Sequence, residues 1–285
     1  MDKSITKVVE KDLCHGCGIC KTACPTDAIE FTIRKGLYIP IVNNKCINCE
    51  ICLKTCPGIS FDYIKQNNVL FNEQPDDVWI GHFKGLYLAY SNDFDIRFNS
   101  SSGGALTSLL IYALENKVID GAILVKMNEQ NPLMPELFIA NDKKGILGAM
   151  GSKYCAVSID AKIKDIINKR GNYAITGLPC HIHGLRKYQQ VNKSIKDKLI
   201  LSLGLFCSNT ASFYGTEFFL RKKGINLKDV KEIKYRSGGW LGNISVLDKF
   251  GNKINFPRVA NNNRDSILHK ISFHTDFSPI RCLLC

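Results

Sequence analysis

Residues 14–25 read CHGCGICKTACP, and residues 46–57 read CINCEICLKTCP. Both runs have the spacing C-x2-C-x2-C-x3-C-P, and they begin 32 residues apart. A motif that returns in full at such an interval indicates two related structural units packed as a pseudo-symmetric pair. Four thiols so close together, in a chain with 13 cysteines and no secretion signal, point to metal ligation.

The spacing predicts two [4Fe-4S] clusters with crossed ligands. Three closely spaced thiolates bind three irons of a cubane, and the fourth cysteine, one helical turn further on, points away and ligates the other cluster. Gly16 and Gly18 let the backbone fold tightly around the inorganic core, and Pro25 and Pro57 end the two short helices. One cluster is therefore expected to bind Cys14, Cys17, Cys20 and Cys56, and the other Cys46, Cys49, Cys52 and Cys24.

Structural zinc is the alternative, but zinc sites usually pair two C-x2-C knuckles across a long gap. The region resembles the bacterial-type two-cluster ferredoxins, which implies a ferredoxin-like α+β fold. Residues 28–45, AIEFTIRKGLYIPIVNNK, alternate apolar and polar side chains around RKG and predict a hairpin. We expect the ferredoxin domain to span residues 1–64 and a polar linker to span residues 65–78.

The composition of the chain bounds its class. Its 285 residues are enough for about two domains. The sequence contains neither a signal peptide nor an apolar run of about 18 residues, and these features predict a soluble cytoplasmic protein without a membrane span. The formal net charge of +12 falls to about +8 once two clusters of about −2 are counted. Lys and Arg are scattered, which argues against nucleic acid and favours a solvated face or a docking surface for an acidic partner.

From Trp79 onward, short apolar runs alternate with helical patterns, which predicts an α/β domain over residues 79–285. Strands are expected at GLYLAYS (85–91), DGAILVKM (120–127), ELFIAN (136–141), NYAITG (172–177) and KLILSLGLFC (198–207). Helices are expected at GGALTSLLIYALENK (103–117), AKIKDIINKR (161–170), HIHGLRKYQQV (181–191) and FYGTEFFLRKKG (213–224). After Val230, NISVLDKFGNKINFP (243–257) is typical of an antiparallel hairpin, so a mixed sheet is expected.

Three turns of the larger half concentrate unusual residues. The loop NSSSGGALT (99–107) has serines that are good N-caps and glycines that allow close approach, so it is either a well-capped helix start or a phosphate site at a helix N-terminus. The turn GSKY (151–154) carries one cation and one aromatic ring. In GLPCHIHG (177–184), Cys180 lies in a first helical turn, which favours a thiolate. His181 and His183 are expected to be surface or capping groups.

Five cysteines lie outside the repeat. Cys207 is expected to end a strand, and the last two form a C-x2-C at the end of the chain. Four of the five would suffice for one further cluster built from scattered segments, and small buried apolar groups are the alternative. The five are Cys155, Cys180, Cys207, Cys282 and Cys285.

Together with the ferredoxin pair, the stretches SSGGALTSLL, GSKYCAVSID, ITGLPCHIHGLRK, LGLFC, YRSGGWLGN and RCLLC resemble the family of coenzyme F-420 hydrogenase/dehydrogenase beta subunits in order and spacing. The resemblance covers nearly the whole chain. It implies that an α/β domain binds FAD beside a [4Fe-4S] cluster and that electrons pass between a hydride carrier and iron–sulfur centres. Family members continue past the final C-x2-C with an acidic stretch, so a chain ending at Cys285 is expected to be a fragment or a short form, with the third cluster site incomplete or frayed.

The resemblance also implies site residues. Lys153, if it lies near the flavin, would stabilise the anionic reduced ring. No acid–base group is required, so no catalytic side chain is assigned. The resemblance places Ser101, Ser102, Gly103, Gly104 and Thr107 at the FAD, with Gly151, Ser152, Lys153 and Tyr154 close by. It places Cys180, Cys207, Cys282 and Cys285 at the candidate third cluster.

We therefore expect an oxidoreductase that passes electrons between reduced coenzyme F-420, FAD and [4Fe-4S] clusters, with a ferredoxin-type or catalytic redox subunit as partner. A flavin can split a two-electron donor into single electrons for the clusters. The sequence has no G-x-G-x-x-G with a following acidic residue to hold a nicotinamide. Two alternatives stay open: a non-catalytic electron-transfer subunit, which needs clusters alone, and a ferredoxin-fed flavin reductase of another organic substrate.

Overall fold

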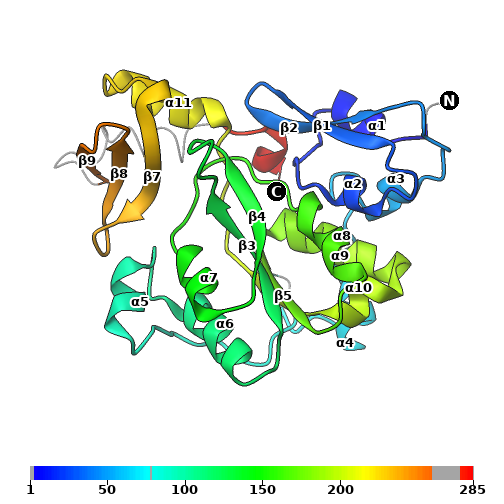
Figure 1. The fold of residues 1–285 in the computed structure, drawn as a ribbon. Helices are drawn as coiled ribbons and strands as arrows, with labels where there is room; N and C mark the ends of the chain where they lie inside the picture. The colour runs from blue at the N-terminus through cyan, green and yellow to red at the C-terminus, as the bar shows by residue number, and fades with distance from the viewer. Residues whose placement is uncertain (1–2, 78, 259–276, 285) are drawn as a thin grey trace.

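The computed structural model describes residues 3–77, 79–258 and 277–284, arranged as Figure 1 shows. The N-terminal part contains helix α1 (Thr6–Glu10) and a hairpin of β1 (Ile29–Arg34) and β2 (Leu37–Val42). The two strands pair antiparallel over their whole length, which confirms the predicted hairpin. Lys35 and Gly36 form its turn, both with positive φ, as tight two-residue hairpin loops require.

Two short helices, α2 (Ile19–Ala23) and α3 (Ile51–Thr55), occupy equivalent places in the cysteine repeat. Each begins after a residue in the left-handed conformation, Gly18 before α2 and Glu50 before α3. Each ends at the fourth cysteine of its run, because that cysteine is extended and the proline after it disfavours a helical conformation there. The backbone therefore repeats with the sequence.

The segment that follows the repeat is not the irregular linker that its polar composition predicted for residues 65–78. Helix α4 (Tyr63–Phe71) crosses the expected boundary. The side chain of Asp62 caps this helix by accepting a hydrogen bond from the Lys65 amide at 2.9 Å. Asn72 ends it in the left-handed conformation, with φ of 56°. An Asx cap at each end therefore supports a helix that buries the polar Gln66 and Asn67 and exposes several apolar side chains.

A four-stranded mixed sheet forms the centre of the larger half, with the order β4-β3-β5-β6. Strand β3 (Gly121–Met127) pairs antiparallel with β4 (Pro135–Ala140) and parallel with β5 (Tyr173–Gly177). Strand β6 (Leu199–Gly204) pairs parallel with β5. The mixed α/β class is as predicted, but β6 ends three residues before Cys207, which does not end the strand.

The antiparallel hairpin predicted after Val230 is present but belongs to a different sheet. Strands β8 (Asn243–Asp248) and β9 (Lys253–Pro257) pair antiparallel. Strand β7 (Val230–Ser237) pairs with β8, and the three strands form a sheet of their own. The mixed character of the central sheet therefore comes from β4 and not from this hairpin.

Helices cover both faces of the central sheet. Because alternate residues of β3 point to opposite faces, Ala122 and Leu124 pack with α6 and α7, while Ile123 packs with α8, α9 and α10. No helix in the described ranges is long and apolar enough to cross a membrane. The helix bounds are α5 (Phe94–Asn99), α6 (Ala105–Glu115), α7 (Lys143–Gly148), α8 (Asp160–Ile167), α9 (Pro179–Val191), α10 (Lys193–Lys198) and α11 (Phe213–Lys222), with short 3-10 helices η1 (Leu227–Asp229) and η3 (Ile280–Leu284).

The predicted strand GLYLAYS is wrong. Residues 85–91 have no strand assignment, and Leu88 is fully exposed. Both sides of β3 are already paired, to β4 and β5, so this segment has no free edge there. It packs instead against the loop before α6, where the Ser91 amide donates a hydrogen bond to the Gly103 carbonyl at 2.6 Å. A short apolar run was therefore no evidence of burial here.

The ferredoxin part and the larger half share one hydrophobic core. Ile19 and Ala23 of α2 are buried in the same cluster as Ile163 of α8 and Leu185 of α9. Full burial of one such isoleucine is worth about 1.5–3 kcal/mol. A side chain at Gly184 would place its Cβ 2.9 Å from the Ile19 side chain, so the glycine allows α9 to approach α2 closely.

Candidate functional site

One group of four thiols surrounds a small cavity in the ferredoxin part. Cys46, Cys49 and Cys52 of the second run line it together with Cys24 of the first run. These are the four cysteines that the crossed pattern assigns to one cluster. Cys52 is buried and Cys49 is exposed, so the group reaches from the interior to the surface. A donor set made only of thiols suits an iron–sulfur cluster or zinc.

A second group, made of Cys14, Cys17, Cys20 and Cys56, lies deeper. Burial raises the pKa of the Cys14 thiol to about 11. Burial, and repulsion by the other thiolates of the group, raise the pKa values of Cys17 and Cys20 well above the ordinary value. Four thiolates in this largely buried group would need cations to offset their charge, and the irons of a cluster would supply them. The residues therefore fit an iron–sulfur cluster.

Backbone amides point at sulfur in both groups. The Gly16 amide donates a hydrogen bond to the Cys14 Sγ at 3.4 Å. The Ala28 amide reaches the Cys24 Sγ at 3.3 Å, and the Gly58 amide reaches the Cys56 Sγ at 3.3 Å. Hydrogen bonds to sulfur stabilise thiolate ligands and tune the reduction potential of a cluster. Both fourth cysteines therefore accept an amide hydrogen bond at sulfur, although from amides at different positions after the cysteine.

The candidate third cluster site is less well defined. Cys180 lies in the first turn of α9, as predicted, and its thiolate would raise the pKa of Cys17, so it lies beside the deeper thiol group. Cys207 follows β6 and is exposed, and Cys282 belongs to η3. The Leu205 amide bonds the Gly177 carbonyl at 2.9 Å, so the chain beyond β6 starts beside the chain beyond β5. Cys285 lies outside the described residues.

Cys155 and the two histidines of α9 do not add ligands to these groups. Cys155 is buried, which raises its pKa to about 12, and it is hydrogen-bonded to Tyr235. His181 is buried and not at the surface, but it has a capping role, because its Nδ1 accepts a hydrogen bond from the Leu178 amide at 3.2 Å. His183 stacks on Phe61, with ring centroids 3.9 Å apart.

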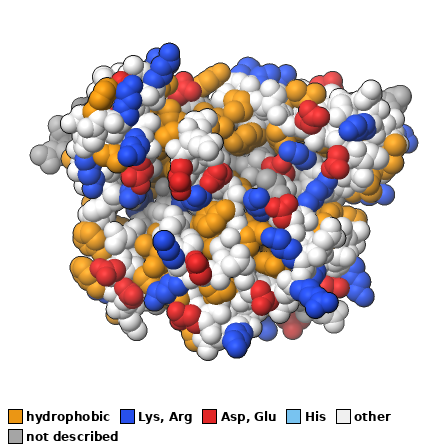
Figure 2. All heavy atoms as spheres, viewed as in Figure 1, with side chains coloured by type: hydrophobic (Ala, Val, Ile, Leu, Met, Phe, Trp, Pro, Cys, Tyr) orange, Lys and Arg blue, Asp and Glu red, His pale blue; other side chains and the backbone are white. Residues whose placement is uncertain are grey.

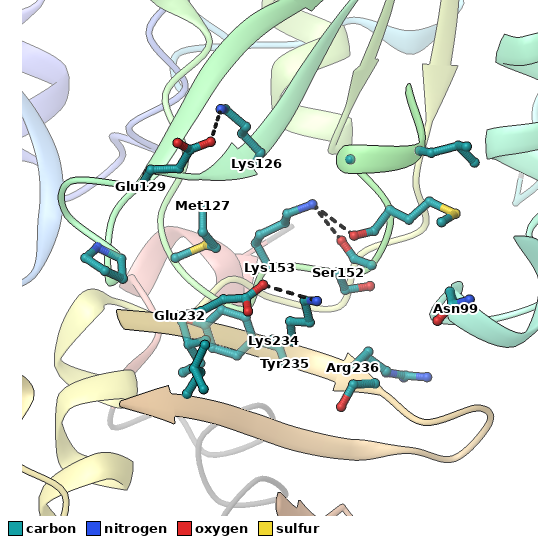
Figure 3. A pocket seen from close by; sticks show the side chains of 18 of the residues that line it. Asn99, Lys126, Met127, Glu129, Ser152, Lys153, Glu232, Lys234, Tyr235 and Arg236 are labelled. Atoms are coloured by element: carbon teal, nitrogen blue, oxygen red, sulfur yellow. Dashed lines mark hydrogen bonds and ion pairs between the residues drawn. The ribbon is translucent and has the colours of Figure 1, made fainter. Parts of the chain in front are cut away.

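A cleft of about 1250 Å³ lies between the central sheet and the three-stranded sheet (Figure 3). Its walls come from β3, from α7 with the following turn, and from β7. Basic side chains outnumber acidic ones, and Lys126 and Lys234 pair with Glu129 and Glu232 at 3.1 Å each. The basic residues are Lys126, Lys144, Lys153, Lys231, Lys234, Lys253 and Arg236, against the acidic Glu129, Asp142 and Glu232.

The loop 100–104 and the turn 151–154 meet at the edge of this cleft. The Ser152 amide donates a hydrogen bond to the Ser101 Oγ at 2.7 Å. Arg236 of β7 joins both segments, because its Nε bonds the Tyr154 hydroxyl at 3.0 Å and its guanidinium also bonds the Ser101 carbonyl. The two segments assigned to FAD from the resemblance are therefore neighbours, and Gly151, Ser152 and Lys153 line the cleft.

The start of α6 differs from the prediction that a serine caps it. Gly104, with φ of 78°, is the N-cap, and no side chain caps the helix there. Ser102 is exposed, and Thr107 is buried within α6. A Cβ at Gly103 would lie 2.9 Å from the Ala89 carbonyl oxygen, so this glycine permits close packing of residues 89–91. The loop itself does not line the cleft, but it contacts the turn 151–153, which does.

Lys153 lies in the cleft wall with its ammonium turned toward backbone oxygens. Its Nζ donates to the carbonyls of Ala149 at 2.6 Å, Gly151 at 2.9 Å and Met150 at 3.4 Å (Figure 3). Burial lowers the pKa of Lys153 to about 8. Three carbonyls fix the position of this cation, and their dipoles offset part of its charge. A mobile surface lysine would not be held in this way.

Sequence reasoning missed most of the basic cleft. Arg236, Lys231 and Lys234 come from β7, more than 75 residues after the turn that they face, and no local spacing relates them to it. The spacing of Lys234 and Arg236 was the one available signal, because residues two apart on a strand share a face, and Lys231 does not fit this spacing. On the face drawn in Figure 2, basic and acidic side chains are interspersed, so the overall surplus of basic residues did not indicate where a basic cleft lies.

Family models match most of the chain. The model for the N-terminal part of the coenzyme F-420 hydrogenase/dehydrogenase beta subunit matches residues 86–164, and the model for its C-terminus matches residues 171–285. Two 4Fe-4S binding domain models match residues 7–30 and 43–66, one over each cysteine run. The resemblance noted in the sequence is therefore confirmed.

Curated relatives are similar to most of the chain at low identity. The coenzyme F-420-dependent sulfite reductase of Methanocaldococcus jannaschii is 26% identical over 250 residues, which are 82% of this chain and 37% of that protein. One of the subunits of the F(420)H(2) dehydrogenase of Methanosarcina mazei is 24% identical over 255 residues, which are 84% of this chain and 66% of that protein. The chain thus spans between about a third and two thirds of these relatives.

A solved structure is also similar. A chain of the F-420-reducing [NiFe] hydrogenase complex from Methanosarcina barkeri is 26% identical and covers 61% of each chain, with a TM-score of 0.47. The two models of the beta subunit are sufficient to assign the family without this structure. The chain belongs to the family of coenzyme F-420 hydrogenase/dehydrogenase beta subunits and carries two 4Fe-4S binding domains at its N-terminus.

Proposed function

We propose that the protein is an iron–sulfur flavoprotein oxidoreductase that passes electrons between a hydride carrier, FAD and [4Fe-4S] clusters. Residues 1–64 hold two clusters with the crossed ligands, residues 79–285 form the FAD-binding domain, and residues 65–78 join them. Reduced coenzyme F-420 is the proposed carrier, in keeping with the names of the relatives. A ferredoxin-type protein or a catalytic redox subunit is the proposed partner.

The observation that carries this proposal is a packed layer between the cleft and the deeper thiol group. Met127 lines the cleft and packs in one apolar cluster with Cys155 and Tyr38. Tyr38 belongs to β2 of the ferredoxin part, and its carbonyl oxygen would lie 2.9 Å from a Cβ at Gly16, between Cys14 and Cys17. A cofactor in the cleft and a cluster on these cysteines would therefore be separated by packed protein and not by solvent.

The contacts at the cleft edge support FAD in particular. Arg236 holds the loop 100–104 against the turn 151–154, so the N-terminus of α6 is fixed beside the cleft. Free amides at a helix N-terminus suit a pyrophosphate. The volume of about 1250 Å³ exceeds the ~300–1,000 Å³ usual for a single ligand, which leaves room for a carrier beside a flavin.

The residues of the cleft have defined roles in this proposal. Bound FAD would accept two electrons from the carrier and release them one at a time to the clusters. Lys153 holds its ammonium fixed in the cleft wall, where it would stabilise the anionic ring of the reduced flavin. Lys144, Lys231 and Lys253 give the cleft a surplus of positive charge, which would attract the acidic side chain of F-420. No side chain is required to transfer a proton.

A third cluster extends the proposal. Cys180, Cys207, Cys282 and Cys285 are its proposed ligands. Cys180 lies beside Cys17, which supports a position next to the deeper cluster. Electrons would then pass from the third cluster to the cluster at Cys17 and from there to the cluster at Cys49. The exposed Cys49 would lie at the outer end of this chain of clusters.

Anaerobic purification with cofactor analysis tests the proposal. The protein should contain at least ~8 iron and ~8 sulfide per chain, and extracted flavin should be FAD and not FMN. Arg236→Met should lose FAD and keep its ferredoxin iron, and Lys117→Met, an exposed change at the end of α6, should keep both. Stoichiometric zinc with little iron would contradict the clusters. Clusters without any flavin would favour the electron-transfer subunit.

A further inference from the structure

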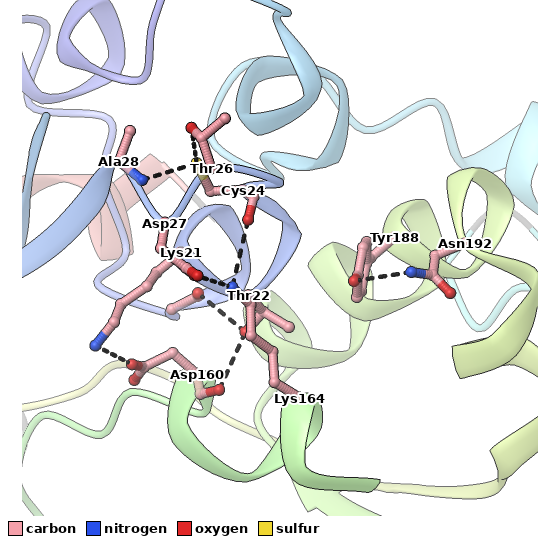
Figure 4. A network of polar contacts seen from close by, with 11 residues as sticks. Lys21, Thr22, Cys24, Thr26, Asp27, Ala28, Asp160, Lys164, Tyr188 and Asn192 are labelled. Carbon is pink, nitrogen blue, oxygen red and sulfur yellow. Dashed lines mark hydrogen bonds and ion pairs between the residues drawn. The ribbon is translucent and has the colours of Figure 1, made fainter. Parts of the chain in front are cut away.

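Two lysines of the larger half reach equivalent atoms in the two halves of the cysteine repeat. The Nζ of Lys164, on α8, donates a hydrogen bond to the Cys24 carbonyl at 3.3 Å (Figure 4). The Nζ of Lys187, on α9, donates to the Cys56 carbonyl at 2.6 Å and to the Ser60 carbonyl at 2.9 Å. Cys24 and Cys56 are the fourth cysteines of their runs, and each forms the C-cap of a short helix.

This pairing does not follow from the repeat itself, because α8 and α9 lie outside it. Each ammonium sits at the C-terminal end of a ferredoxin helix, where the helix dipole favours a cation. Each also bonds a cysteine that carries an amide hydrogen bond at its sulfur. Fixed charge from the larger half is therefore placed beside both candidate clusters, once for each.

The two lysines differ in how strongly their charge is offset. Lys164 also forms an ion pair with Asp27, a carboxylate of the ferredoxin part. For Lys187, the described residues include no carboxylate partner, and its ammonium lies nearer to its cysteine carbonyl, at 2.6 Å against 3.3 Å for Lys164. The field of Lys187 should therefore be the stronger of the two.

We propose that Lys187 and Lys164 are positioning residues that dock the ferredoxin part on the larger half and raise the reduction potentials of its two clusters. Lys187 acts mainly on the cluster that Cys56 ligates, and Lys164 acts more weakly on the one that Cys24 ligates. Reduction adds one electron to a cluster, so a nearby cation stabilises the reduced form. This inference rests on the crossed ligands of the proposed function.

The consequence concerns the order in which the clusters fill. The cluster that receives the stronger field is also the one whose ligand Cys17 lies beside Cys180, on the side of the larger half. We call this cluster, ligated by Cys17 and Cys56, the inner cluster and the one ligated by Cys24 the outer cluster. The ammonium of Lys187 favours placing the first electron on the inner cluster. The outer cluster, with the exposed Cys49, would then pass electrons on from a lower potential.

The test is a redox titration of the anaerobic full chain with dithionite, followed by electron paramagnetic resonance. Lys187→Met keeps most of the apolar stem and removes the charge. It should change the ratio of reduced to oxidised inner cluster about tenfold at a fixed potential, a shift of about 59 mV to lower values. Lys164→Met should change the ratio of reduced to oxidised cluster at Cys24 by about threefold or less, because Asp27 already offsets much of the charge of Lys164.

Lys162→Met is the matched control. Lys162 lies on α8 as Lys164 does, but it pairs with Asp165 at 3.0 Å and bonds no cysteine of the described residues, so both waves should stay in place. Should a Met variant lose iron, Lys187→Arg keeps the charge and should keep the wild-type wave. Asp27→Asn, at an exposed carboxylate, frees the charge of Lys164 and should raise the potential of the cluster at Cys24.

The outcomes separate this inference from the proposed function. Full iron content with unchanged waves in Lys187→Met and in Asp27→Asn would overturn the role of the lysines and leave the clusters intact. Shifts of the same single wave by Lys187→Met and Lys164→Met would overturn the one-lysine-per-cluster assignment. Absence of iron from the wild-type chain would instead contradict the proposed function.

Discussion

Replacing Gly18 with alanine should loosen the contact between the ferredoxin part and the larger half. Gly18 has a φ of 91°, which an L-residue rarely adopts, and an added Cβ would lie 2.8 Å from the Asp160 amide nitrogen and 3.0 Å from the Asp160 Cβ. The positive φ costs alanine about 1–2 kcal/mol. Overpacking against backbone that cannot move aside costs about 1–3 kcal/mol more. The two effects together come to about 2–5 kcal/mol.

Gly251→Ala provides the matched control. Gly251 has nearly the same φ, 92°, but nothing lies within 4 Å of the added Cβ. It should therefore show the backbone penalty alone. For a chain of this size, 1 kcal/mol shifts the Tm by about 2–4 °C, so Gly251→Ala should lose a few degrees and Gly18→Ala about 4–20 °C. Thermal unfolding of the anaerobic proteins, followed by circular dichroism, measures both. Equal losses in the two variants would refute the contact between Gly18 and Asp160 as the cause.

Three further predictions concern the site. Cys24→Ala should damage the cluster held by Cys46, Cys49 and Cys52 and spare the one beside it, and iron-specific spectra showing the reverse would refute crossed ligation. Gly103→Val should lose FAD in cofactor extracts with the ferredoxin iron unchanged, and normal retention would remove the loop from the site. Burial lowers the pKa of Lys153 to about 8 from its ordinary 10.5, so the unfolded chain binds more protons between these values and stability rises with pH there. The difference in Tm between the flavin-free wild type and Lys153→Met should accordingly increase from about pH 8 to about pH 10. A difference that stays constant would contradict this prediction.

Features set by local spacing were predictable from the sequence. The cysteine repeat, the hairpin around Lys35 and Gly36 and the first turn of α9 at Cys180 each depend on residues close together in the chain. Their geometry follows from positive φ, from proline and from the thiol spacing alone. The thiol groups around Cys24 and Cys56 gather in the combinations that the crossed pattern requires.

Features that depend on distant partners were not predictable. The segment 85–91 is an apolar run of strand length, but the sheet has no free place for it beside β3. Arg236 and the lysines of β7 reach the cleft only through the packing of a second sheet. Lys164 and Lys187 read as ordinary charged residues of amphipathic helices, and only the docking of α2 and α3 on α8 and α9 gives them partners.

Rapid anaerobic mixing of FAD-loaded protein with reduced coenzyme F-420 tests the central claim most directly. The account predicts bleaching of the flavin absorbance followed by reduction of the clusters, because the cleft and the deeper thiol group share the packed layer of Met127, Cys155 and Tyr38. The same protein mixed with NADPH should react slowly or not at all. Equal or faster reduction by NADPH would overturn the carrier. A flavin that bleaches while iron-loaded clusters stay oxidised would contradict the electron path itself.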